Sequence, residues 1–209
     1  DPVRRVTASH WLTVANAEDE RGGGAWMLHQ LRAPLGLEKF IPAGARTTEV
    51  WTPPGIDFVR KARAQKQAGM FPWFEIEKPI WWEAPVLMAL EPPDSIGMAH
   101  NHLNQYGVLD NEAWARPRDV AKFPGPRGLL DYSLSLIYRY WNLGIRIPPS
   151  AGSASGVLPN PVGYNRVYVK VDGEFSVEKW YRGLREGRSF VTNGPLLEWE
   201  LRKNGEWLE

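Results

Sequence analysis

His100 and His102 are the residues of this sequence whose types and spacing best suit chemistry. They lie two residues apart near the end of an expected strand, and extended residues at that spacing point to the same face. Two adjacent imidazoles are good ligands for zinc, manganese or iron, and a carboxylate such as Glu77 completes a set of three. An open fourth position lets the metal lower the pKa of a bound water and produce a nucleophile. The alternative is a structural pair of histidines that form hydrogen bonds in a loop.

Glu75 and Glu77 form a second pair at the same spacing. Glu75 is the candidate catalytic residue, in the role of general base. The alternative is that one or both carboxylates form salt bridges with Lys78 or with a nearby arginine. His29 is a further candidate metal ligand near the end of an expected strand. For His29, as for His10, the alternative is a partly buried, hydrogen-bonded histidine.

A second group of residues suits the binding of a ligand. Eleven tryptophans in 209 residues indicate either a core rich in large rings or a wall of rings that stacks on a sugar or an aromatic molecule. The small residues from Ser150 to Gly156 predict a closely packed loop whose amides can hold an anion. No histidine follows this loop, which excludes a serine triad in that order. The candidate ligand-binding residues are Trp81, Trp82, Trp114, Ser153, Ser155, Arg166, Arg188 and Asn193.

Alternating strands and helices in the middle of the chain must position these residues, and the alternation predicts a mostly parallel α/β sheet or barrel. We expect strands at 70–76, 94–100, 145–148, 166–171 and 189–192, and helices at 56–68, 82–90, 129–142 and 176–186. Folds of this kind place their sites at the carboxyl ends of the strands. Four of the expected strands end in Glu75 and Glu77, in His100 and His102, in the 150–156 loop and in Asn193. These ends converge on one edge if the sheet is parallel.

The two ends of the chain follow less regular patterns. Strands are expected at 6–14 and 26–31, a polar, glycine-rich turn or loop at 18–24, and irregular structure at 32–55. Residues 103–127 predict a long loop. A last strand is expected at 196–202, before the hairpin signal Asn204-Gly205. The predicted division is an α/β domain at 1–195 and, at 196–209, the start of a β hairpin or of a further β domain.

Composition excludes several classes of function. Because the chain has no cysteine, it has no disulfide scaffold, thiolate zinc site or cysteine nucleophile. With 25 basic and 24 acidic side chains its formal charge is +1, which argues against nucleic-acid binding by broad neutralisation of phosphates. No apolar run approaches the roughly 18 residues that span a bilayer, so no membrane partner is expected. The expected partner is a small molecule, and the oligomeric state is left open.

Localisation also stays open. The first residues, Asp1-Pro2-Val3-Arg4-Arg5, show no apolar signal region. A signal removed upstream of residue 1 would be consistent with an extracytoplasmic protein.

The last third of the chain resembles a known family. The segment from Gly163 to Val169, then Trp180, and then Leu184 to Pro195 with the run Gly-Arg-Ser-Phe-Val-Thr-Asn-Gly-Pro are similar to the CehA/McbA branch of the PHP (polymerase and histidinol phosphatase) superfamily. The similarity covers residues from about 56 to 205. It implies a metal-dependent hydrolase on a distorted α/β barrel, in this chain incomplete at the start and followed by a short β extension.

The resemblance also implies a reduced or lost metal site. The superfamily begins with a His-x-His strand that supplies two ligands, and no such pair lies near the start of this chain. A later Gly-Ser-Asp-x-His motif corresponds here to the segment 152–156, Gly-Ser-Ala-Ser-Gly, and a His-Pro element corresponds to Glu77-Lys78-Pro79. The ligands left for a single divalent metal are Glu77, His100, His102 and either His29 or His10.

Two functions follow from these observations. The first is a metal-dependent hydrolase that attacks an ester, amide or phosphoester with metal-bound water. The second is a binding module for a saccharide or other small molecule, which keeps the fold without the chemistry. The histidine pair favours the first function, and the tryptophans favour the second.

Overall fold

The computed structural model describes residues 3–5, 7, 11–13, 16–21, 24–33, 35, 55–66, 71–111, 115–196, 202–204 and 206–207. Among the candidates from the sequence, His10 and Trp114 lie outside the described residues, as does most of the expected irregular segment 32–55.

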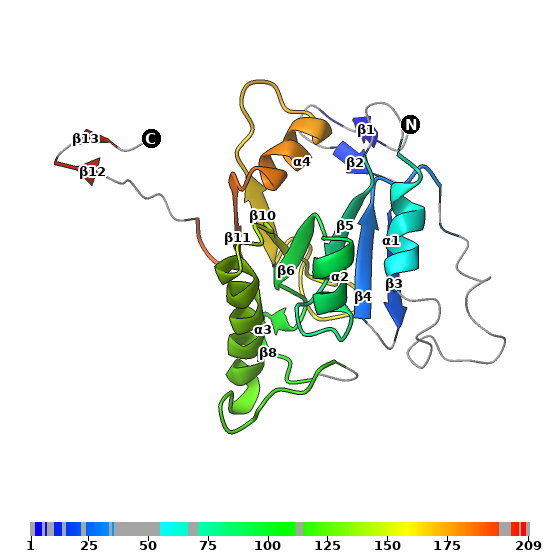
Figure 1. Cartoon of the computed structure of the whole chain (residues 1–209). Coiled ribbons are helices and arrows are strands. Elements are labelled where there is room, and N and C mark those ends of the chain that lie inside the picture. Colours follow the sequence, from blue (N-terminus) through cyan, green and yellow to red (C-terminus); the bar gives the residue numbers. More distant parts are fainter. Residues whose placement is uncertain are drawn as a thin grey trace.

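The described residues form a mixed α/β structure (Figure 1). The helices are α1 (Gly55–Arg63), α2 (Ala84–Leu90), α3 (Gly125–Asn142) and α4 (Val177–Arg185). The strands are β1 (Val3–Arg5), β2 (Trp11–Thr13), β3 (Ala17–Arg21), β4 (Gly24–His29), β5 (Trp73–Ile76), β6 (Ser95–Ala99), β7 (Leu103–Asn104), β8 (Gly107–Val108), β9 (Pro149–Ala151), β10 (Arg166–Val169), β11 (Ser189–Thr192), β12 (Arg202–Lys203) and β13 (Glu206–Trp207).

The central sheet has the strand order β3-β4-β5-β6-β9. Strands β5, β6 and β9 are parallel, whereas β3 and β4 form an antiparallel hairpin, and β4 pairs with β5 in the antiparallel direction. The expected parallel arrangement is therefore present in the half of the sheet formed by β5, β6 and β9, and absent from the half formed by β3 and β4. Within the described residues this sheet stays open at β3 and β9, so they form no closed barrel. The antiparallel pair β10–β11, which packs beside β9, was expected to continue the parallel strands.

Helices α1 and α2 cover one face of the sheet, as Figure 1 shows, and α3 packs against β6. Because side chains alternate along a strand, Trp26, Phe74 and Ile96 all point to this face, where they are buried with the apolar sides of the helices. Burial of these large side chains is the main stabilising contribution to the fold.

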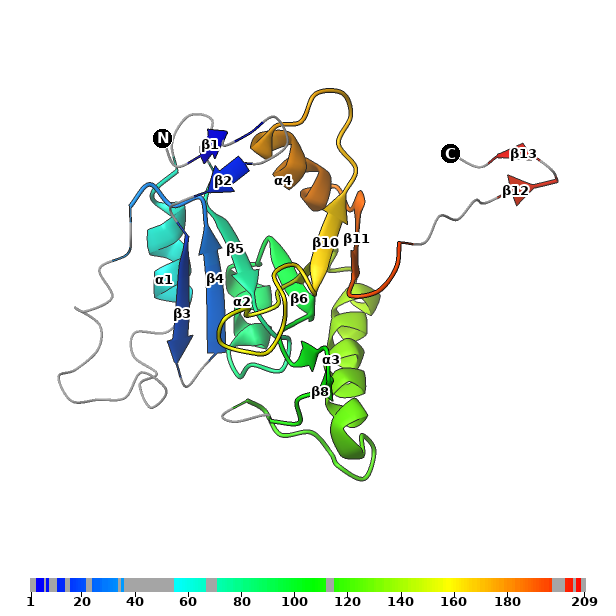
Figure 2. The ribbon, with the colours of Figure 1, turned by 180° about the vertical axis from the view of Figure 1, so that it is seen from behind.

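The segment between β9 and β10 crosses the opposite face of the sheet (Figure 2). The Asn165 side chain anchors it, because its Nδ2 donates to the carbonyl oxygens of His100, Leu103 and Gly152 at 2.8–3.1 Å. Asn160 adds a second anchor: its Nδ2 donates to the Ser153 carbonyl and its Oδ1 accepts from the amide of Gln105. Two buried amide side chains thus fix a loop that contains little regular structure.

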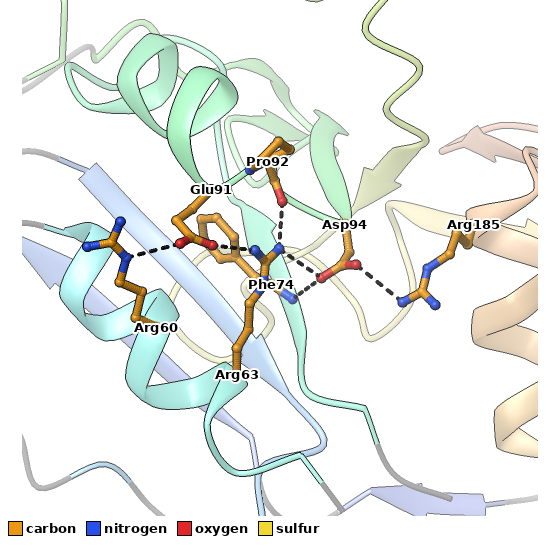
Figure 3. A network of polar contacts seen from close by, with 7 residues as sticks. All are labelled: Arg60, Arg63, Phe74, Glu91, Pro92, Asp94 and Arg185. Carbon is orange, nitrogen blue, oxygen red and sulfur yellow. Dashed lines mark hydrogen bonds and ion pairs between the residues drawn. The ribbon is translucent and has the colours of Figure 1, made fainter.

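A polar network joins the helices at the start of β6, as Figure 3 shows. The Asp94 carboxylate accepts a hydrogen bond from the Phe74 amide at 3.0 Å and ion-pairs with Arg63 of α1 at 3.8 Å and with Arg185 of α4 at 3.2 Å. Glu91, at the end of α2, ion-pairs with Arg60 and Arg63 at 3.0 and 2.7 Å. The network therefore fixes α4 and α1 at the edge of the sheet where β6 begins.

Several element boundaries differ from the expected ones. The expected turn at 18–24 overlaps β3, which lies at the edge of the sheet, where charged residues are common. The expected strand 145–148 lies instead at β9, because the amides of Ile145 and Ile147 donate to Tyr140 and Ile145 and so close the end of α3. Helix α3 begins at Gly125, before the expected Leu129, and the β7–β8 hairpin lies inside the expected long loop.

Candidate functional site

A cavity of about 170 Å³ lies over the face of the sheet that the loop crosses. Strand pairing explains why its residues meet: Glu18 lies opposite Met27, Met27 lies opposite Glu75, and His29 is two residues further along β4. The ends of β5, β6 and β9 supply the remaining wall. The lining residues are Glu18, Met27, His29, Glu75, Glu77, Gly97, His100, Asn101, Ala151, Gly152 and Ala154.

Glu75 is buried in this wall, with 8% of its surface exposed. Its Oε2 accepts a hydrogen bond from the Ser95 hydroxyl at 2.8 Å, and the Ser95 oxygen accepts one from the Trp73 indole at 2.8 Å. Burial raises the pKa of the Glu75 carboxyl to about 7, against the opposing effect of the Ser95 hydrogen bond. Glu75 thus exchanges a proton near neutral pH, as a general acid or base requires.

Glu77 has a different partner, although it lies only two residues away. Both of its carboxylate oxygens lie 2.6 Å from the Lys78 ammonium. Lys78 is 3% exposed, and its ammonium lies 4.8 Å from the centre of the Trp81 ring, a cation–π contact. Glu77 therefore forms the salt bridge with Lys78 that the sequence offered as the alternative to a catalytic or metal-binding role.

His100 and His102 do lie side by side, with their ring centres 5.5 Å apart. The backbone N–H of His102 donates to Nδ1 of His100 at 3.3 Å. Burial and the positive charge of Lys78 lower the pKa of both rings, that of His102 to about 4 and that of His100 well below its ordinary value. Both rings are therefore neutral. Because Nδ1 of His100 is an acceptor, its hydrogen lies on Nε2, which has no hydrogen-bond partner among the described residues.

His29 joins the wall from β4. Its Nδ1 lies 3.0 Å from the hydroxyl of Tyr181 on α4, which also packs against Trp73. Burial lowers the pKa of His29 to about 4, so this ring is neutral as well. The hydrogen bond to Tyr181 connects α4 to the cavity and matches the expected alternative of a partly buried, hydrogen-bonded histidine.

These residues do not fit a divalent metal in their present arrangement. Among the residues that the structure describes, no three His, Asp or Glu side chains are placed to hold one metal ion. The Glu77 carboxylate is occupied by Lys78. Coordination by Nε2 of His100 would move its hydrogen to Nδ1, where it would oppose the N–H of His102.

The predicted ligand-binding residues have mostly structural roles. Trp81 is buried in the core, whereas Trp82 is 44% exposed, so the two rings form no stacking wall. The Ser153 hydroxyl accepts from the Asn165 amide and donates to the Asn165 carbonyl. The Arg166 guanidinium donates to the carbonyls of Gly163 and Gly194. Ser155 and Asn193 are exposed, and Arg188 ion-pairs with Asp172. Six of the candidates do not line the cavity: Trp81, Trp82, Ser153, Ser155, Arg166 and Asn193.

Several residues that shape the site are not among those predicted from the sequence. Ser95 and Tyr181 carried no signal, because their contacts join segments 20 and 152 residues apart. Asn101 stands between the two histidines and its Oδ1 has no hydrogen-bond partner among the described residues. Glu18 could have been found by the alternation of β3 and β4, once the glycine-rich segment was interpreted as a hairpin.

The fold and site define an open α/β domain with a small polar cavity. Comparison of the chain with protein-family models, with curated proteins and with solved structures gave no match. Within the described residues, no helix has the length and apolar character needed to cross a membrane.

Proposed function

We propose that this chain is a binding domain for a small, uncharged, polyhydroxylated molecule such as a monosaccharide or polyol, on a fold related to the PHP superfamily. The observation that carries the proposal is a pair of buried polar atoms at the wall of the cavity, Nε2 of His100 and Oδ1 of Asn101, neither of which has a partner among the described residues. Buried polar groups are nearly always hydrogen-bonded in folded proteins, so a ligand or ordered water is expected at these atoms.

The size of the cavity supports a small ligand. At about 170 Å³ the cavity is smaller than the roughly 300–1,000 Å³ of pockets that take drug-sized ligands. The wall offers a donor at His100, an acceptor at Asn101, and carboxyl oxygens at Glu75 and Glu77. Alternating donors and acceptors are the pattern that hydroxyl groups match, because each hydroxyl both donates and accepts.

The charge balance favours an uncharged ligand. The negative charge of Glu77 is compensated by Lys78, and the rings of His29 and His100 are neutral. Glu75, with a pKa of about 7, is about half protonated at neutral pH. Among the described residues that line the cavity none is cationic, and the nearby Lys78 ammonium is already paired with Glu77, so a strongly anionic ligand would meet no unpaired positive charge there.

A ligand panel tests this proposal. Monosaccharides, polyols, amino acids and dicarboxylates are titrated while tryptophan fluorescence and the melting temperature are recorded, because Trp73 lies one hydrogen bond from Ser95 and two from Glu75. We expect saturable binding of an uncharged polyhydroxyl compound, with stabilisation of about 2.7 kcal/mol at a hundred times the Kd. Asn101→Leu should abolish it, and Asn193→Leu, at an exposed site, should not. A flat response to the whole panel would refute the proposal.

A metal-dependent hydrolase is the second candidate. It is favoured by one observation, the convergence of His29, Glu75, Glu77 and His100 on one cavity. The contacts of Glu77 and His100 described above oppose it. Elemental analysis of the purified protein and of His102→Ala separates the candidates: stoichiometric metal that disappears in the variant would favour the hydrolase, and a folded wild type without metal would favour the binding domain.

A further inference from the structure

We propose that Tyr181 positions the imidazole of His29 so that this ring, like that of His100, presents an N–H donor to the cavity, and that the ligand meets both donors with oxygen acceptors. The proposal names the groups by which the site binds, and for the ligand it rests on the proposed function. The part that concerns Tyr181 and His29 can be tested on the protein alone.

The first step is the place of His29 between α4 and the cavity. The His29 ring lines the cavity from the end of β4, and its Nδ1 lies 3.0 Å from the Tyr181 hydroxyl. The Tyr181 ring packs against Trp73 and Trp180, and the centre of each indole lies 5.0 Å from its own centre. These ring contacts hold the hydroxyl at Nδ1 of His29.

The second step is the direction of this hydrogen bond. Burial raises the pKa of the Tyr181 hydroxyl above its ordinary value, so the hydroxyl keeps its hydrogen at neutral pH. Among the described residues, Nδ1 of His29 is its one hydrogen-bond partner. If Nδ1 carried a hydrogen, the hydroxyl hydrogen would have no acceptor among these residues, whereas an Nδ1 that accepts satisfies both groups. The hydrogen of the neutral His29 ring therefore lies on Nε2.

The third step is the agreement between the two rings. In His100 the backbone N–H of His102 occupies Nδ1 at 3.3 Å, which likewise leaves the hydrogen on Nε2. Within the part of the chain that the structure describes, neither Nε2 has a hydrogen-bond partner. A side-chain hydroxyl and a backbone amide thus fix the same tautomer in two rings that line one cavity, and both N–H groups are free to donate to a ligand.

The chemistry of the ligand follows from these donors. An imidazole N–H donates to the oxygen of a hydroxyl, an ether or a carbonyl, but an ammonium has no lone pair to accept it. A neutral sugar or polyol carries such oxygens at several positions, so it can pair with both rings. An ammonium placed against either ring would leave a buried N–H unpaired, at a cost in affinity.

The first experiment determines the tautomers by nuclear magnetic resonance of the ring nitrogens without ligand. The chain has four histidines, and His29→Gln identifies the signals of His29. Spectra at pH 8 lie above the ordinary histidine pKa of about 6.5, so the rings are neutral without any help from burial. We expect wild-type His29 to carry its hydrogen on Nε2 alone. Tyr181→Phe should shift the Nδ1 signal of His29 and let the second tautomer appear, and Tyr106→Phe, at an exposed position, should change neither.

Two results would overturn the role of Tyr181. One is wild-type His29 with its hydrogen on Nδ1 or shared between the two nitrogens. The other is a folded Tyr181→Phe in which the Nδ1 signal is the same as in wild type. If Tyr181→Phe does not fold, the wild-type tautomer decides alone, since a hydroxyl that donates to Nδ1 requires the hydrogen on Nε2.

The second experiment adds D-glucose, glycerol and myo-inositol as probes. A probe that binds should shift the Nε2–H signals of both His29 and His100. Its affinity should fall about tenfold or more in His29→Leu, and less in His29→Gln, whose amide N–H can replace the ring donor. Binding that leaves one of these signals unmoved would overturn the donor role of that ring. A flat response to all three probes would count against the proposed function, whereas the tautomer is measured without ligand, so the two failures are distinguishable.

Discussion

At the scale of single residues, two glutamates with the same sequence spacing acquire different properties from their contacts. Glu75 is buried against Ser95 and keeps its proton up to about pH 7. Glu77 is held by Lys78 through both oxygens. The difference arises from their positions in the chain. Glu75 lies within β5, between its sheet partners Met27 and Ser95. Glu77 lies just beyond the strand, where the Lys78 ammonium contacts its carboxylate.

Replacement of Glu75 by Gln should stabilise the protein at alkaline pH. The folded-state pKa, about 7, is higher than the ordinary value of 4.5, so the charged carboxylate is disfavoured in the folded state. The loss of folding stability caused by the charged Glu75 carboxylate is absent below pH 4.5, grows between pH 4.5 and 7, and is complete above pH 7. A shift of this size corresponds to about 3 kcal/mol. Urea unfolding at pH 5 and pH 8 measures it.

The matched control for this measurement is Glu174→Gln, at an exposed position. We expect Glu75→Gln to be more stable relative to wild type at pH 8 than at pH 5, as measured by the free energy of unfolding. The difference between Glu174→Gln and wild type should be the same at both pH values. Equal pH dependence of Glu75→Gln and wild type would show that Glu75 ionises like an exposed carboxylate.

At the scale of elements, the close approach of β5 and β6 is fixed by one glycine. A Cβ at Gly97 would lie 1.8 Å from the Glu77 carbonyl oxygen, closer than any contact that folded proteins tolerate. Gly97 also lines the cavity, so the absent side chain both lets the strands approach and leaves space beside Glu75. Gly152, at the end of β9, lines the same cavity but has open space at its Cβ position.

Gly97→Ala and Gly152→Ala are therefore expected to behave differently. Gly97→Ala must move the end of β5 away from β6, and we expect it to lower the free energy of unfolding by about 3 kcal/mol or more. Gly152→Ala should leave stability unchanged or raise it by less than about 1 kcal/mol, because alanine restricts the unfolded chain. Chemical denaturation of both variants provides the measurement. Equal effects would mean that β5 and β6 separate at little cost.

The elements were predictable from the sequence where local signals decide them, and the site only in part. The helix expected at 176–186 matches α4, and the Ser176 hydroxyl oxygen caps it by accepting a hydrogen bond from the Lys179 amide at 3.2 Å. The strand expected at 94–100 and the helix expected at 129–142 also lie within a few residues of β6 and α3. The partners of Glu75 and His29 could not be predicted, because Ser95 and Tyr181 reach them only through tertiary packing. Local patterns cannot show which of several cations a carboxylate will bind, so the sequence left both a metal and Lys78 open as partners of Glu77, and the structure shows the contact with Lys78.

At the scale of the whole molecule, the two faces of the central sheet have separate tasks. Apolar residues such as Trp26 and Phe74 pack under the helices, and polar residues such as His29 and Glu75 line the cavity on the other face. Alternation along each strand allows one sheet to serve both. The sequence predicted the α/β alternation and a mostly parallel sheet, but the antiparallel β3–β4 hairpin and the absence of a closed barrel among the described residues became visible only in the structure.

This arrangement makes the stability of the whole molecule sensitive to mild acid. His29, His100 and His102 all have a folded-state pKa below the ordinary 6.5, about 4 for the first and last, so they stay neutral while the unfolded chain binds protons. The contribution of the three histidines to stability is therefore complete above pH 6.5 and is lost as the pH falls toward 4.5. Over the same range Glu75 opposes this loss by one proton, because its folded-state pKa is raised. A net difference near two protons predicts a loss of about 2.7 kcal/mol per pH unit. Urea unfolding in steps of half a pH unit should show this slope, and His102→Gln should reduce it. A free energy of unfolding that is constant between pH 6.5 and 4.5 would show that the three rings take up protons without unfolding, and would contradict their burial as neutral groups.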